Sequence, residues 1–127
     1  MQLALRLLVG LVGIFNALIG LGFLFLPGKM TIEFALSPVG TQGMATLRAD
    51  FPAFFLTGAL FALIGALRAQ RGPLLVPISL LGFALLGRIV SVLLDGVGPA
   101  TFQPMIVEAC MIGLLALGYR YFRNAHD

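Results

Sequence analysis

The chain has 127 residues, of which 60% are hydrophobic and only 10% are charged, and its mean hydropathy is +1.06. Soluble domains carry about 25% charged residues, so a water-soluble fold of this size could not cover so much apolar surface. The net charge of +3 comes from basic residues scattered around the ends of apolar runs, which excludes a nucleic-acid-binding patch. Composition therefore predicts an integral membrane protein.

Four apolar runs each reach the roughly 20 residues that cross about 30 Å of hydrocarbon. The first run is longer than the core of a signal peptide, and no small-x-small cleavage site follows it, so we expect a retained helix. The sequence thus predicts an all-α, antiparallel bundle of four transmembrane helices that forms one membrane domain over residues 1–127. The expected helices span residues 3–26, 49–67, 73–94 and 103–122, with a long outer loop over residues 27–47.

The basic residues near the helix ends favour one side of the membrane. The opposite side has only Lys29 and Arg48, and its second loop has no Lys or Arg. The positive-inside rule therefore places both termini in the cytoplasm, together with the residues that decide this orientation, Arg6, Arg68, Arg71, Arg120 and Arg123.

The connection over residues 27–47 is rich in proline and glycine and is unlikely to form one regular element. A short interfacial helix over residues 31–36, capped by Thr31, would cover the outer mouth of the bundle. A simple linker is the alternative. In contrast, the tight turn at residues 68–72 makes the second and third expected helices antiparallel neighbours.

Small residues recur at four-residue spacing in three of the expected helices. In lipid, such stripes let helix backbones approach closely and gain van der Waals contact. The pattern predicts packing within the bundle and leaves open an interface to a second copy or to a larger membrane complex. The stripes are Gly13 and Ala17, Gly58 with Ala62 and Ala66, and Ala109 with Gly113.

Arg88 is the most informative residue, because it lies inside an apolar run. It precedes Asp95 by seven residues and therefore lies about 10 Å below the outer end of its helix. A central arginine costs about 2.5 to 3.5 kcal/mol, so it should have a partner or a route to water. Ser91 and Asp95 share its helical face, and Glu108 lies about 6 Å below the outer end of the last helix. We therefore predict a contact between Arg88 and Glu108.

Further polar residues are expected in the same outer layer. Arg48 and Asp50 stand at the start of the second expected helix, and Asn16 could contribute from beneath. Simpler interpretations exist for the charged residues: a cap before Pro52 for Asp50, a turn for Asp95, a headgroup contact for Arg48, and a structural ion pair for Arg88 and Glu108. The predicted ligand-binding or structural ion cluster contains Arg48, Asp50, Arg88, Ser91, Asp95 and Glu108.

Catalytic, cofactor and metal-binding motifs are not recognisable. His126, the only histidine, lies in the terminal tail, which argues against a histidine-ligated haem or a multi-histidine metal site. Cys110 has no second cysteine to pair with and is expected to be a small core residue. We therefore expect no catalytic residue, no cofactor and no metal.

Two motifs resemble a known family. The stretch Leu47-Arg48-Ala49-Asp50-Phe51 and the pattern Gly-Arg-x-x-Ser-x-x-x-Asp-Gly over residues 87–96, together with Glu108, resemble the bacterial four-helix membrane family called domain of unknown function 4345. The resemblance covers nearly the whole chain and implies a small protein of the bacterial inner membrane, without implying an activity. It places Arg48, Arg88, Asp95 and Glu108 at polar positions of the family, whereas Pro52 stands where a small residue is expected.

The sequence does not specify a biochemical activity. It favours a non-enzymatic binding or accessory protein whose outer polar pocket holds a lipid headgroup or small amphiphile, or anchors a partner subunit. One alternative is a small proton-coupled transporter that titrates Glu108 or Asp95. Another is a four-helix membrane enzyme of isomerase type that uses buried carboxylates.

Overall fold

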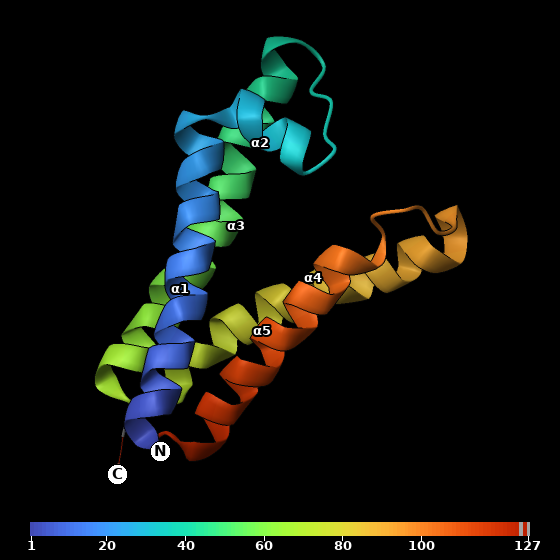
Figure 1. The fold of residues 1–127 in the computed structure, drawn as a ribbon. Coiled ribbons are helices and arrows are strands. Elements are labelled where there is room, and N and C mark those ends of the chain that lie inside the picture. The colour runs from blue at the N-terminus through green and yellow to red at the C-terminus, as the bar shows by residue number, and fades with distance from the viewer. Residues whose placement is uncertain (125, 127) are drawn as a thin grey trace.

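The computed structural model describes residues 1–124 and 126. The fold is all-α, and four helices are long and apolar enough to cross a membrane, by length and composition. They run in alternating directions, as expected for an antiparallel four-helix bundle (Figure 1). The elements in chain order are α1 (Gln2–Phe25), α2 (Pro27–Glu33), α3 (Gly40–Arg68), the 3-10 helix η1 (Gly72–Leu74), α4 (Leu75–Asp95) and α5 (Phe102–Tyr121).

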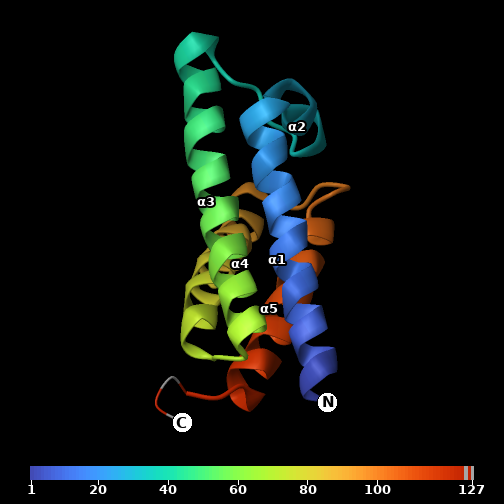
Figure 2. The same cartoon turned by 90° about the vertical axis from the view of Figure 1, so that its left-hand side faces the viewer.

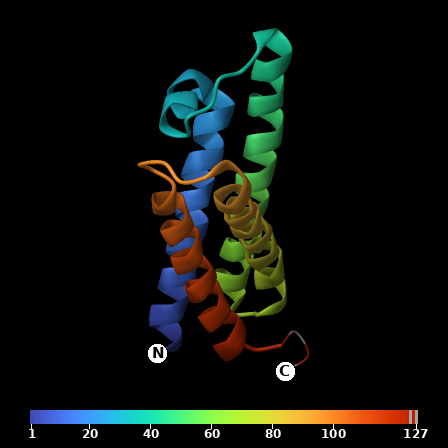
Figure 3. The ribbon, with the colours of Figure 1, turned by 90° about the vertical axis from the view of Figure 1, so that its right-hand side faces the viewer.

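The four long helices form two antiparallel pairs that meet at one end. Helices α1 and α3 lie side by side along most of their length, whereas α4 and α5 lean away from them, so the pairs make a V (Figure 1). Seen from the two opposite sides of Figure 1, α4 and α5 lie behind α1 and α3 (Figure 2) and in front of them (Figure 3). We call the closed end of the V the base, and the other end the open end. The N-terminus and residues 122–124 lie at the base.

Close backbone approach holds α1 against α3. A Cβ atom on Gly13 would lie 2.8 Å from Cγ of Leu63, and one on Gly20 would lie 2.7 Å from Cγ of Leu56. No side chain fits at these positions without movement of its neighbour, so the small-residue stripe of α1 packs within the chain as expected. The stripe of α5 does not, because Ala109 is exposed and a Cβ on Gly113 would meet no described atom within 4 Å.

A hydrophobic core joins the two pairs near the base. It contains residues from all four long helices and from η1, and Val9, Leu74 and Leu115 are fully buried. Side-chain packing of this kind holds membrane helices together where hydrophobicity alone cannot. The buried members are Leu5, Val9, Val12, Ala62, Ala66, Leu74, Leu81, Met111, Leu115 and Phe122.

Hydrogen bonds also fix the base. Arg6 donates from Nε to the carbonyl of Ala66 and from Nη2 to the carbonyl of Leu67, both at 2.7 Å, and so caps the end of α3. Beyond α5, the Arg123 amide donates to the carbonyl of Ala69 at 3.1 Å, and the Arg71 amide donates to the carbonyl of Arg123 at 3.0 Å. The α3–α4 turn is therefore tied to the segment that follows α5.

A cluster of aromatic rings lies at the end of the α1–α3 pair that is far from the base. Phe23 is fully buried, and its ring centroid lies 4.7 Å from that of Phe51 and 5.0 Å from that of Phe34, which follows α2. The connection thus contains a short helix, but it begins at Pro27 rather than at Thr31. Thr31 is not its cap, since its hydroxyl donates to the carbonyl of Gly28 at 2.7 Å. Figure 1 shows α2 over α1 and α3 only, not over the mouth of the whole bundle.

The second membrane helix, α3, begins at Gly40, well before the expected start at residue 49. Gly40 has φ +64° and marks the boundary, but Gly43 lies inside the helix, where a Cβ would be 3.2 Å from the backbone of Pro38. Glycine at this position therefore permits a close contact and does not interrupt the helix, although the glycine content of residues 27–47 predicted an irregular connection. Pro52 consequently lies inside α3, and the interpretation of Asp50 as a helix cap was wrong. By contrast, α4 ends at Asp95, and Gly96 follows it with φ +91°, a backbone conformation that glycine adopts readily.

Candidate functional site

Arg88 and Glu108 connect the two helices of the second pair. Nε of Arg88 on α4 donates a hydrogen bond to Oε1 of Glu108 on α5, with a nitrogen–oxygen distance of 2.9 Å. Glu108 belongs to the buried face of α5, one turn from Met111. The contact that the sequence predicts between these two side chains is therefore present.

The two partners differ in exposure. The side chain of Arg88 is 38% exposed and that of Glu108 only 11%. The second carboxylate oxygen, Oε2 of Glu108, is buried and has no hydrogen-bond partner among the described residues. A guanidinium has five N–H donors, and the bond to Glu108 uses one of them. Arg88 thus has unused donors, and Glu108 has a buried acceptor without a partner among the described residues.

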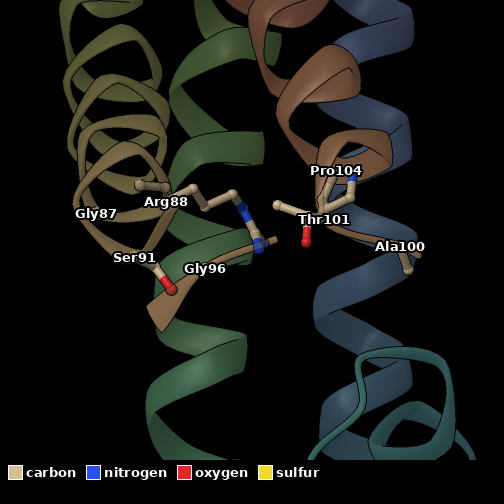
Figure 4. A pocket seen from close by; sticks show the side chains of 8 residues that line it. Gly87, Arg88, Ser91, Gly96, Ala100, Thr101 and Pro104 are labelled. Carbon is tan, nitrogen blue, oxygen red and sulfur yellow. The ribbon is translucent and has the colours of Figure 1, made fainter. Parts of the chain in front are cut away.

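A cleft of about 360 Å³ lies beside Arg88, between α4 and α5 at the open end. Figure 4 shows the Arg88 side chain extending from α4 across this cleft toward Thr101 and Pro104 at the start of α5. The other residues that line the cleft have small side chains, so the guanidinium is accessible from it. The lining residues are Ala84, Gly87, Arg88, Ser91, Gly96, Ala100, Thr101 and Pro104.

Two hydroxyl groups line the cleft and have different hydrogen-bond roles. Ser91 donates from Oγ to Oδ2 of Asp95 at 2.8 Å, so its oxygen remains as an acceptor. Oγ1 of Thr101 accepts a hydrogen bond from the Gly98 amide at 2.6 Å, so its own O–H remains free to donate. Asp95 is exposed and does not line the cleft.

The predicted cluster of five charges does not form, because Arg48 and Asp50 belong to the other arm of the V. Arg48 donates from Nη1 to the carbonyl of Leu24 at 3.2 Å, near the end of α1. Asp50 is exposed and lines a shallow depression on α3. The sequence argument compared heights along parallel helices, but α3 and α4 diverge from the base, so residues at similar heights are far apart (Figure 1).

Asn16 lies beneath the pair, as expected, but does not join it. The residue is 4% exposed, and its Nδ2 donates to the carbonyl of Val12 at 2.8 Å and to Sδ of Met111 at 3.4 Å. These bonds engage the amide nitrogen within α1 and across the α1–α5 contact. Asn16 is therefore a neighbour of the Glu108 turn and makes no hydrogen bond to either charge.

Other features of the site were not visible in the sequence. Thr101 was not singled out, although its position next to the first turn of a helix is a common place for a hydroxyl that acts locally. Cys110 is exposed, not a core residue as expected. Within residues 1–124 and 126, no three histidine, cysteine or acidic side chains come together in a way that could hold a metal ion.

Comparison with known proteins adds no relative. Searches found no matching family model, no matching curated protein and no matching solved structure. The family resemblance noted in the sequence stays a prediction, and the function has to be argued from the site alone.

Proposed function

We propose that this chain is a small binding or accessory protein of the bacterial inner membrane that holds an amphiphile through the cleft between α4 and α5. The observation that carries the proposal is the way in which Arg88 is bound. An arginine that only pairs two helices gains most from a bidentate contact with both carboxylate oxygens. Here Glu108 accepts from Nε alone, and the rest of the guanidinium extends into the cleft.

The surroundings of the cleft suit an amphiphile. The two helices that form the cleft expose large apolar side chains on other parts of their surface, including Leu86, Leu93 and Ile106. A polar headgroup in the cleft could contact Arg88 while its hydrocarbon runs along the apolar surface of α4 and α5. Intramembrane charged residues often mark such binding sites.

Native mass spectrometry of the purified protein tests the proposal. We expect the wild-type chain to retain one amphiphile, and Arg88→Ala to lose it. Arg48→Ala is the matched control, because it removes a guanidinium from the other arm of the V. A wild-type mass equal to the bare chain, or equal retention by Arg88→Ala, contradicts the proposal.

We place the base of the V on the cytoplasmic side, with both termini inside. Supporting this are the basic residues near the base and the lack of Lys or Arg in the loop between α4 and α5. In a Cys110→Ala background, Val97→Cys should react with a membrane-impermeant maleimide added to intact spheroplasts. Reaction only after lysis would reverse the orientation.

A second candidate function is proton-coupled transport, in which Glu108 carries the proton. It is favoured by the buried Oε2 atom of Glu108, which has no hydrogen-bond partner among the described residues and so leaves an acceptor for a transported proton donor. Proteoliposomes with an internal pH dye test this candidate. Wild-type protein should pass protons under an imposed potential, Glu108→Gln should not, and Asp95→Asn should behave as wild type. Absence of wild-type proton flux excludes this function.

A further inference from the structure

We infer that the group recognised in the α4–α5 cleft is an oxyanion, a phosphate or a carboxylate. This inference rests on the proposed binding function and names the chemistry of its ligand. It follows from the charge and the hydrogen-bond donors that the cleft presents, and from the burial of Glu108 behind Arg88.

The charge that faces the cleft is positive. Arg88 is the one charged side chain among the described residues that line it. Its partner Glu108 lies behind it, mostly buried, and is not part of the lining. The two charges of the pair therefore largely cancel, which lowers the electrostatic cost of keeping Arg88 there without a ligand. A ligand in the cleft nevertheless contacts the cationic edge of the pair.

The donors in the cleft match an oxyanion in number and position. The Nη1 and Nη2 groups of Arg88 form a planar edge of the kind that binds phosphate and carboxylate with two parallel hydrogen bonds. Thr101, toward which Arg88 extends in Figure 4, adds an O–H donor because its oxygen already accepts from Gly98. Ser91 offers only an acceptor, since its proton goes to Asp95.

Other ligand classes fit less well. An ammonium group in the cleft would meet the like charge of Arg88, while the carboxylate of Asp95, which accepts from Ser91, is not itself part of the lining. A neutral headgroup would leave the remaining guanidinium donors without an ionic acceptor. An oxyanion compensates the charge and uses the donors together.

Binding of defined probes to the detergent-purified protein tests this inference. The probes are phosphatidylglycerol, a fatty acid, diacylglycerol with matched acyl chains, and inorganic phosphate. We expect phosphatidylglycerol and the fatty acid to bind at least about tenfold more tightly than diacylglycerol, because charge-assisted hydrogen bonds are the strong ones. Arg88→Gln keeps an amide donor for Glu108 and should lower the affinity for both anionic lipids to that for diacylglycerol. Thr101→Val should weaken the binding of both anionic lipids severalfold, and Arg48→Ala should leave it unchanged.

The outcomes separate this inference from the proposed function. If diacylglycerol binds as tightly as phosphatidylglycerol and both depend on Arg88, the cleft binds amphiphiles but the oxyanion inference is wrong. If no lipid responds to Arg88→Gln but inorganic phosphate does, the oxyanion stands, its source is soluble, and the amphiphile proposal fails. If no probe responds to Arg88→Gln, both fail. The comparison of lipids on the wild-type protein needs no variant, so a poorly folded variant does not spare the inference.

Discussion

Alanine at Gly13 and at Gly113 should change stability in opposite directions, although both glycines belong to the small-residue stripes seen in the sequence. At Gly13, the new Cβ would lie 2.8 Å from Cγ of Leu63 and 3.3 Å from the carbonyl oxygen of Ala59. Leu63 must move, and overpacking of this kind costs about 1 to 3 kcal/mol. At Gly113, no described atom lies within 4 Å of the new Cβ. Both variants also gain about 1 kcal/mol, because alanine favours a helix over glycine.

The net expectation is that Gly13→Ala destabilises the protein by up to about 2 kcal/mol and that Gly113→Ala stabilises it by up to about 1 kcal/mol. Unfolding in a titration from mild detergent into sodium dodecyl sulfate, followed by circular dichroism, measures the difference. Equal shifts of the two midpoints would refute the close α1–α3 contact. If Gly113→Ala is the destabilising variant, this face of α5 is an interface with a second copy, which the sequence left open.

Three further perturbations test other parts of the structure by the same unfolding assay. Arg6→Ala should lower the free energy of unfolding by about 1 kcal/mol, since it removes two charge-assisted hydrogen bonds to the end of α3 at a partly exposed position. Arg6→Lys should not restore the lost stability, and an unchanged stability of Arg6→Ala would show that the base does not need this cap. Phe23→Ala should lower the free energy of unfolding by about 3 kcal/mol, because Phe23 is fully buried among aromatic rings. A smaller loss of stability than an alanine substitution of an exposed phenylalanine causes would contradict the aromatic cluster. A double-mutant cycle of Arg88→Ala and Glu108→Ala should give a coupling of only about 1 kcal/mol, because Arg88 is partly exposed; a coupling several times larger would favour a purely structural pair.

Much of the fold follows from local pattern. Apolar runs of membrane length predict the four long helices, and a short connection predicts that α3 and α4 are antiparallel neighbours. The Arg88–Glu108 contact was also predictable, because both residues are too deep in apolar helices to stay alone and both lie toward the same end. These inferences need only helix geometry and the chemistry of single residues.

The separation of Arg48 and Asp50 from the other charges could not be read from the sequence. It depends on the angle between the helix pairs, which is set where they meet, for example by the fit of Leu80 against Gly58 near the base. The early start of α3 has a more local cause. The proline and glycine content of residues 27–47 predicts irregular structure, yet Gly43 lies inside α3, where its lack of a Cβ lets the backbone of Pro38 approach.

An amphiphile that binds between α4 and α5, as proposed, brings its headgroup next to Arg88. A photoreactive phosphatidylglycerol with the reactive group close to its headgroup locates this site, after irradiation in nanodiscs and mapping of the labelled peptides by mass spectrometry. We expect labels concentrated over residues 84–104, which contain the lining of the cleft, and their loss in Arg88→Gln. Labels confined to α1 and α3, or an even distribution that Arg88→Gln leaves unchanged, would contradict this site.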